Sequence, residues 1–141
     1  MRIYFDTSFL FSLYAPDANS EAAAAVMAPG VKRLLTAFGE LELRNALQLG
    51  VFRKELTPAM TRAAYGAFQK SVADGVFEIC PLPERWRERS HQIAARLTAT
   101  LGTRTLDLIH VASALELKAD ALFTFDKHQR GLARALKMRL N

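Results

Sequence analysis

Apolar residues follow two alternating patterns along this chain. Short apolar runs alternate with longer stretches in which apolar residues recur every three or four positions. The short runs predict strands and the longer stretches predict helices. The predicted strands are residues 3–5, 31–36, 76–80 and 121–125, and residues 138–141 could add a short final strand. Strands that alternate with helices indicate an α/β fold with a parallel sheet.

The helical stretches are delimited by residues typical of helix ends. The predicted helices are residues 21–28, 38–55, 58–74, 83–102, 105–119 and 126–137. Asn19 or Ser20 would cap the first of them. In the third, Thr57 is in the N-cap position, Pro58 in the first helical position and Gly75 just past the end. No linker or repeat interrupts the 141 residues, so we expect a single domain over residues 1–141.

Composition narrows the class of protein and the kind of partner. Cys80 is the only cysteine, which excludes an internal disulfide and suits a reducing compartment. No apolar stretch is as long as a membrane span and no secretion signal is visible, so we expect a cytoplasmic protein with no membrane partner. The formal net charge of +5 and the pI of about 9.7 favour a polyanion such as nucleic acid, or an acidic protein, as partner.

Three aspartates stand where strands end or helices begin. Asp6 follows the first predicted strand, Asp126 follows the strand 121–125, and Asp107 is near the start of the helix 105–119. Ligand sites of open parallel sheets lie outside the carboxyl ends of the strands, so these acids could meet there. Each could instead be a helix N-cap with no chemical role, which is the commoner role of an aspartate between a strand and a helix.

Glu42 carries more information because of its neighbours on the predicted helix. The residues three, four and seven positions away are almost all apolar, among them Leu35, Phe38 and Leu49. An acid on an apolar face needs a cation or hydrogen-bond donors. Its partner would be either an arginine such as Arg104 or a metal ion. Clustered carboxylates repel one another without a cation, and oxygen ligands select Mg²⁺ or Mn²⁺ over Zn²⁺.

The ordered set of acids resembles a known family. Asp6-Thr7-Ser8 after the first strand, Glu42 in ELRNAL, Asp107 in LDLIHVASAL and Asp126 in LFTFD are similar to the acidic motifs of PIN-domain ribonucleases, and among them to VapC-type toxins of toxin–antitoxin pairs. The resemblance extends from residue 3 to about residue 130. It implies an α/β/α sandwich around a twisted parallel sheet of four to five strands.

The resemblance also implies roles for individual residues. Asp6, Glu42, Asp107 and the more variable Asp126 would be catalytic acids that bind one or two Mg²⁺ or Mn²⁺ ions. The supporting residues would be Ser8 and Thr124, whose hydroxyls touch a metal-bound water or orient a carboxylate, and Asn45, which would face the same cleft one turn beyond Glu42. The activity implied is endonucleolytic hydrolysis of RNA by a metal-activated water.

The implied partners are RNA, a VapB-like antitoxin that covers the cleft, and a second copy of the chain. Arg104 is the first candidate for RNA contact, although it could instead pair with Glu42 or Asp107; Arg44 and Arg53 are further candidates. The apolar faces near Phe52, Tyr65 and Phe68 could belong either to the core or to a homodimer interface.

Two alternatives to the ribonuclease come from other functional classes. One is a receiver-like phospho-acceptor domain, which also places carboxylates at strand ends around Mg²⁺. It fits less well, because Asp6 is followed by hydroxyl residues rather than by a second acid. Ser8 likewise differs from the second aspartate of a haloacid-dehalogenase-like phosphatase. The other alternative is a non-catalytic nucleic-acid-binding module in which the aspartates are only helix caps.

Overall fold

A single parallel sheet organises the structure, a computed structural model that describes residues 1–141. Its five strands lie in the order β3-β2-β1-β4-β5, and all four neighbouring pairs are parallel. The strands are β1 (Arg2–Phe5), β2 (Lys32–Thr36), β3 (Glu78–Cys80), β4 (Ala121–Phe123) and β5 (Arg139–Leu140). The predicted α/β fold with four to five parallel strands is confirmed, including the short final strand.

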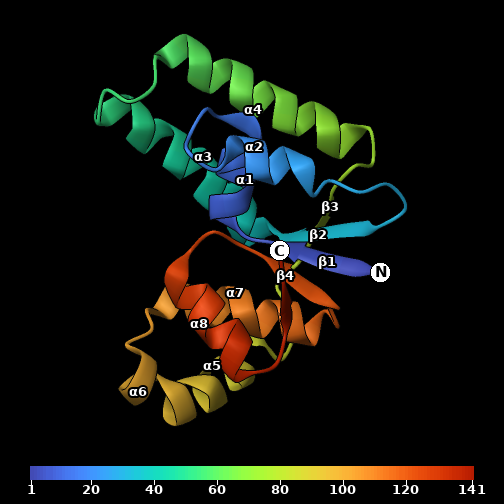
Figure 1. The fold of residues 1–141 in the computed structure, drawn as a ribbon, viewed down its shortest axis with the longest axis vertical. Helices are drawn as coiled ribbons and strands as arrows, with labels where there is room; N and C mark the ends of the chain where they lie inside the picture. The colour runs from blue at the N-terminus through green and yellow to red at the C-terminus, as the bar shows by residue number, and fades with distance from the viewer.

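Helices cover both faces of the sheet, as Figure 1 shows, so the α/β/α sandwich is confirmed. One layer consists of α1 (Thr7–Tyr14), α2 (Ser20–Ala25), α3 (Ala37–Phe52) and α4 (Pro58–Ala73). The other contains α5 (Trp86–Ile93), a π-helical turn (Ala94–Thr98), α6 (Ala99–Leu101), α7 (Thr105–Glu116) and α8 (Lys127–Ala135). None of these helices has the length and apolar character needed to cross a membrane.

Alternation along the strands produces two separate cores. Ile3 and Phe5 pack on the side of α1, α3 and α4, whereas Tyr4 packs on the side of α7 and α8. Leu34 and Leu35 divide between the two cores in the same way. Successive side chains of a strand point to opposite faces, so a central strand covered on both faces is apolar throughout.

Helix α1 has no counterpart among the predicted helices. Its sequence, TSFLFSLY, is apolar on most sides and lacks the polar face that marks an amphipathic helix. In the structure Phe9 and Leu10 are fully buried, because α1 lies between the sheet and the neighbouring helices α3 and α4. A helix buried on several sides resembles a buried strand in its sequence pattern.

Several predicted boundaries also differ from the structure. The predicted helix 83–102 begins only at Trp86, and its second half is the π-helical turn followed by α6. Helix α2 ends at Ala25 and α3 at Phe52, where Lys54 adopts a left-handed conformation with φ of 60°. The ends of α4 agree with the prediction: Thr57 caps it by accepting a hydrogen bond from the amide of Met60.

The strand order creates a switch point between β1 and β4. The chain leaves β1 toward β2 on one side, while β4 and β5 occupy the other side. At this junction the amide of Asp6 donates to the carbonyl oxygen of Phe123 at 3.1 Å. The segments that follow β1 and β4 therefore lie side by side, which is where open parallel sheets form ligand sites.

Candidate active site

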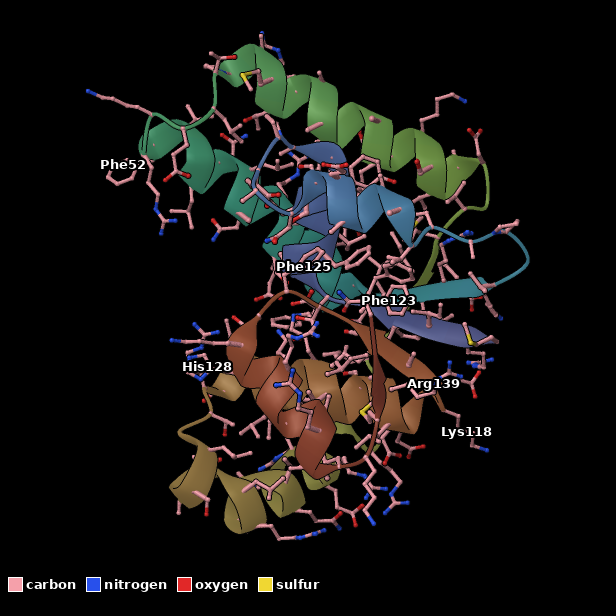
Figure 2. All side chains as sticks on the ribbon, viewed as in Figure 1. Phe52, Lys118, Phe123, Phe125, His128 and Arg139 are labelled. Atoms are coloured by element: carbon pink, nitrogen blue, oxygen red, sulfur yellow. The ribbon has the colours of Figure 1, made fainter.

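A cavity of about 670 Å³ opens at the switch point, beside the carboxyl ends of β1 and β4. All four predicted acids, Asp6, Glu42, Asp107 and Asp126, line it. Other polar or charged lining residues are Thr7, Ser8, Ser12, Asp17, Asn19, Arg53, Glu55, Arg104, His110 and Gln129. The apolar part of the wall includes Phe125, which stacks on Phe9 of α1 with 5.1 Å between ring centroids; Figure 2 shows Phe125 beside the upper helical layer.

Asp6 is both a helix cap and part of the cavity wall. Its Oδ1 accepts hydrogen bonds from the amide of Phe9 at 3.0 Å and from the hydroxyl of Ser8 at 2.8 Å. Burial raises the pKa of this carboxyl above its usual value, although the charge of His110 and the hydrogen bonds oppose that rise. Asp6 is thus the N-cap of α1, as one of the two interpretations predicted. Its other oxygen, Oδ2, accepts a hydrogen bond only from the hydroxyl of Ser8, at 3.0 Å.

Ser8 and Thr124 connect the loops that carry Asp6 and Asp126. The two hydroxyl oxygens are 3.3 Å apart, and Ser8 also accepts a hydrogen bond from the amide of Phe125 at 2.9 Å. Thr124 accepts one from the amide of Asp126 at 3.0 Å. Thr124 is buried and does not line the cavity, so its contribution is to hold the backbone of Asp126 and the hydroxyl of Ser8 in place.

Glu42 finds hydrogen-bond donors rather than an arginine. Its Oε2 accepts from the hydroxyl of Thr7 at 2.8 Å and from Nε2 of His110. The other ring nitrogen of His110 is 3.0 Å from the hydroxyl of Tyr4, and burial raises the pKa of Tyr4, so this hydroxyl keeps its proton. The alternative in which Glu42 pairs with Arg104 is not observed. His110 lines the cavity from a fully buried position.

Arg104 instead bridges the other two acids. Its Nε and Nη2 donate to Asp107 at 2.9 and 3.1 Å, and Nη2 also donates to Asp126 at 2.8 Å. The alternative in which Arg104 pairs with Asp107 is thus confirmed. One guanidinium thus faces two carboxylates, so Asp107, Asp126 and Arg104 together keep a net negative charge.

Asp126 is also a helix cap, for α8. Its Oδ1 accepts from the amides of His128 and Gln129 at 2.8 and 3.1 Å, which leaves Oδ2 for Arg104. Burial raises the pKa of Asp126, but the hydrogen bonds from these amides and from Arg104 outweigh it and hold the pKa below its usual value. Asp126 therefore stays ionised where it faces the cavity.

Two predicted site residues lie elsewhere. Asn45 is exposed on α3 and does not line the cavity, which corrects the prediction that it faces the cleft. Ala46 takes that place, because residues three and four positions after Glu42 lie on opposite sides of it around the helix. Arg44 stacks on the ring of Tyr65 with 4.1 Å to the centroid and is also absent from the lining, whereas Arg53 is part of it.

The sequence pattern did not single out Asp17, Glu55, Gln129 or the role of Thr7. Thr7 was missed because α1, which it begins, was not predicted. Asp17 is held near the cavity by a 2.7 Å hydrogen bond from Ser12, another α1 residue. Glu55 follows the left-handed Lys54, a turn that ends α3 three residues earlier than expected. Recognising a helix in TSFLFSLY would have indicated Thr7 and Asp17.

The electrostatics of the cavity favour a cation. Six carboxylates line it against two arginines, an excess of four negative charges when His110 is left out of the count. Oxygen donors without cysteine suit Mg²⁺ or Mn²⁺. As the side chains stand, no three His, Cys, Asp or Glu form a group that could hold an ion, since Arg104 occupies two acids and Glu42 turns toward Thr7 and His110. The types of donor in the cavity thus suit Mg²⁺ or Mn²⁺, but these side chains would have to rotate before they could bind an ion together.

Comparison with known proteins identifies the family. The model of the PIN domain matches residues 3–135, nearly the whole chain. The chain belongs to the PIN domain family. No curated protein matches this PIN domain. The match favours the ribonuclease resemblance over the receiver-like and phosphatase alternatives.

Solved structures share the fold at low sequence identity. VapC20 of Mycobacterium tuberculosis, described as a sarcin-ricin loop cleaving toxin, is 17% identical with a TM-score of 0.68 and covers 92% of this chain and 94% of its own. VapBC2 of Rickettsia felis, bound to a promoter DNA fragment, is 13% identical with a TM-score of 0.69 and covers 100% and 98%. FitAcB of Neisseria gonorrhoeae is 20% identical with a TM-score of 0.67 and covers 98% and 95%.

Proposed function

We propose that this PIN domain is a metal-dependent endoribonuclease and the toxin of a toxin–antitoxin pair. The observation that carries the proposal is that Asp6, Glu42, Asp107 and Asp126, which are far apart in sequence, line one cavity at the switch point of the sheet. These carboxylates would hold one or two Mg²⁺ or Mn²⁺ ions. A bound ion would lower the pKa of a water that attacks the phosphodiester and stabilise charge on the phosphate oxygens.

The other residues of the site position these acids. Ser8 and the amide of Phe9 fix the carboxylate of Asp6, so that its second oxygen points to the cavity. Thr7 and His110 hold Oε2 of Glu42. Partners of this kind orient the acids that they contact, which would favour binding of a cation once Glu42 and Arg104 have turned.

RNA as substrate is supported by the contrast between the cavity and the whole molecule. The chain carries a net charge of +5 although the cavity lining is acidic, so the excess of Lys and Arg lies outside it. Lys and Arg residues outside the cavity would attract phosphates and make the affinity for RNA depend on salt. Arg104 and Arg53, at the cavity itself, are the residues we expect to contact the phosphate backbone.

An antitoxin partner is supported by the solved structures with the same fold. VapC20 is described as a sarcin-ricin loop cleaving toxin, and a further structure with this fold, from Klebsiella pneumoniae, is described as a toxin–antitoxin complex. We infer that a small antitoxin covers the cavity of this chain as well. A short gene next to this one, whose product co-purifies with the chain, would support this assignment.

We also propose a homodimer, for which an exposed apolar surface offers the interface. Leu41, Leu49 and Phe52 form a stripe along α3, here called the α3 stripe. Figure 2 shows Phe52 at the end of α3, pointing away from the body of the protein. Phe68, by contrast, is fully buried and belongs to the core, and Tyr65 packs beside it.

Incubation of RNA with the purified chain tests the ribonuclease. Wild type should cut RNA with Mg²⁺ or Mn²⁺ and not with a chelator. Asp6→Ala should lose activity by more than about 100-fold, because changes to outer-shell partners of metal ligands alone commonly cause losses of about 10- to 100-fold. Asp74→Ala removes an exposed aspartate that pairs with Lys70 and is the matched control, expected to keep its activity.

Two outcomes would contradict the proposal. Cutting that survives both chelation and Asp6→Ala would exclude the metal site formed by these acids. Wild type that binds RNA but never cuts it under any metal condition would instead support the non-catalytic nucleic-acid-binding module.

A further inference from the structure

We propose that Arg104 is a built-in cation that competes with the divalent ion for Asp107 and Asp126 and is released toward RNA when the ion binds. This inference rests on the proposed function, since it concerns the same acids. It assigns to one side chain two successive partners, first the carboxylates and then a phosphate.

The first argument is the geometry of the guanidinium. It donates to both oxygens of Asp107 and to Oδ2 of Asp126, over distances of 2.8 to 3.1 Å. Oδ2 is the oxygen of Asp126 that is not used to cap α8. The oxygens that a cation would need from these two acids are therefore the ones that Arg104 holds.

The second argument is the unequal burial of the partners. The side chain of Asp107 is 3% exposed, whereas that of Arg104 is 60% exposed. Asp107 is fixed in the wall, but Arg104 can turn into solvent without disturbing the packing. A guanidinium and a divalent ion of the same sign repel at contact distance, so binding of the ion favours this movement.

The third argument is that Asp107 stays supported when the side chain leaves. The backbone amide of Arg104 donates to Asp107 Oδ2 at 3.2 Å, and Asp107 lies in the first turn of α7. Arg104 is the N-cap residue of α7 with extended backbone angles, so rotation of its side chain does not alter the helix. The carboxylate keeps its position for the ion.

The released guanidinium would remain at the cavity mouth, where Arg53 also lines the wall. A guanidinium binds phosphate through two parallel hydrogen bonds, as it binds carboxylate here. Arg104 would leave the acids when an ion binds to them, and its guanidinium would then be available to the RNA backbone.

Binding of Mn²⁺ without RNA, measured by calorimetry and by the electron paramagnetic resonance signal of the free ion, tests the competition. Arg104→Gln should bind Mn²⁺ at least about fivefold more tightly than wild type, the lower end of ordinary coupling between two ligands. Arg104→Lys, which keeps the charge without the planar fork, should fall between them. Arg53→Gln removes the same charge from the same cavity and is the matched control, expected to change affinity by less than about twofold.

Weaker binding in Arg104→Gln would mean that Arg104 holds the acids in place for the ion, which would overturn the competition. An equal gain in Arg53→Gln would also overturn it, because the effect would then be one of general charge. If neither wild type nor any variant binds Mn²⁺, the metal-dependent function itself fails. If wild type binds Mn²⁺ and Arg104→Gln binds it no more tightly, the competition by Arg104 is excluded and the metal-dependent function is not. Thermal unfolding in chelator verifies that each variant is folded.

Discussion

At the scale of single residues, the acids of this cavity serve structure and chemistry with different oxygens. Asp6 and Asp126 each use Oδ1 to accept helix amides, while Oδ2 is directed to Ser8 or Arg104. The helix-cap interpretation and the metal-ligand interpretation are therefore compatible. The first is observed, and the second remains our proposal.

The raised pKa of Asp6 predicts a stability that depends on pH. Burial keeps the proton on this carboxyl to higher pH than in the unfolded chain, whose value is about 3.8. Folding therefore loses stability as pH rises above 3.8, through the range in which the folded carboxyl ionises. Asp6→Asn keeps a good N-cap and cannot ionise. In chelator it should melt at a higher temperature than wild type at pH 7.

The difference in melting temperature between Asp6→Asn and wild type should shrink as pH is lowered and vanish below 3.8, where both side chains are neutral. Scanning calorimetry across this range measures it. A difference that stays constant with pH would show that the pKa of Asp6 is not raised by folding.

At the scale of elements, three of the four acids belong to the start of a helix. Asp6 caps α1, Asp126 caps α8, and Asp107 lies in the first turn of α7. Free amides and the helix dipole favour negative charge at these positions. Three helix N-termini aimed at one cavity thus reduce the repulsion that would otherwise oppose bringing the carboxylates together.

Substitution of Asp126 can separate its cap role from its charge. Asp126→Asn retains an acceptor for the amides of His128 and Gln129, so unfolding free energy should change little. Asp126→Ala should lose about 0.5–2 kcal/mol of stability, the usual effect of removing an N-cap. Chemical denaturation measures both. If Asp126 also holds the metal, the two variants should lose RNA cleavage alike; activity retained by Asp126→Asn would restrict this residue to the cap.

At the scale of the whole molecule, the two cores meet the sheet from opposite sides, and the cavity lies at the edge where the strands end. The α3 stripe leaves apolar side chains uncovered on the side of α3 next to the side that lines the cavity, because Leu41 and the cavity residue Glu42 are about 100° apart around the helix. An interface on the stripe would therefore adjoin the mouth of the cavity.

The α3 stripe predicts the effect of a charge at its tip. Phe52 is 83% exposed, so Phe52→Asp should alter stability by no more than about 0.5 kcal/mol. If the stripe is the homodimer interface, the substitution should weaken self-association by more than about tenfold, as loss of a buried aromatic anchor does. Analytical ultracentrifugation measures this. Leu101→Asp, at an exposed leucine of α6, is the control, and a wild type that stays monomeric would contradict the dimer.

The sequence determined the sheet, most helices and the identity of the acids. Short apolar runs and helical patterns arise from local burial, so they indicate β1 to β5 and helices such as α4 without knowledge of their neighbours. Capping residues act within one turn, which is why Thr57 was located correctly. Helix α1 was not predicted because it is buried on several sides, and that burial depends on the elements around it.

Only the tertiary structure decided how the acids are paired. The sequence left both Glu42 and Asp107 open as partners of Arg104. The strand order places β4 and the start of α8 beside α7, so Arg104 reaches Asp126 as well as Asp107. Glu42 is left to Thr7 and His110, which come from two other helices. Side-chain partners across 22 to 68 residues depend on strand order and helix rotation, and neither is encoded in local spacing.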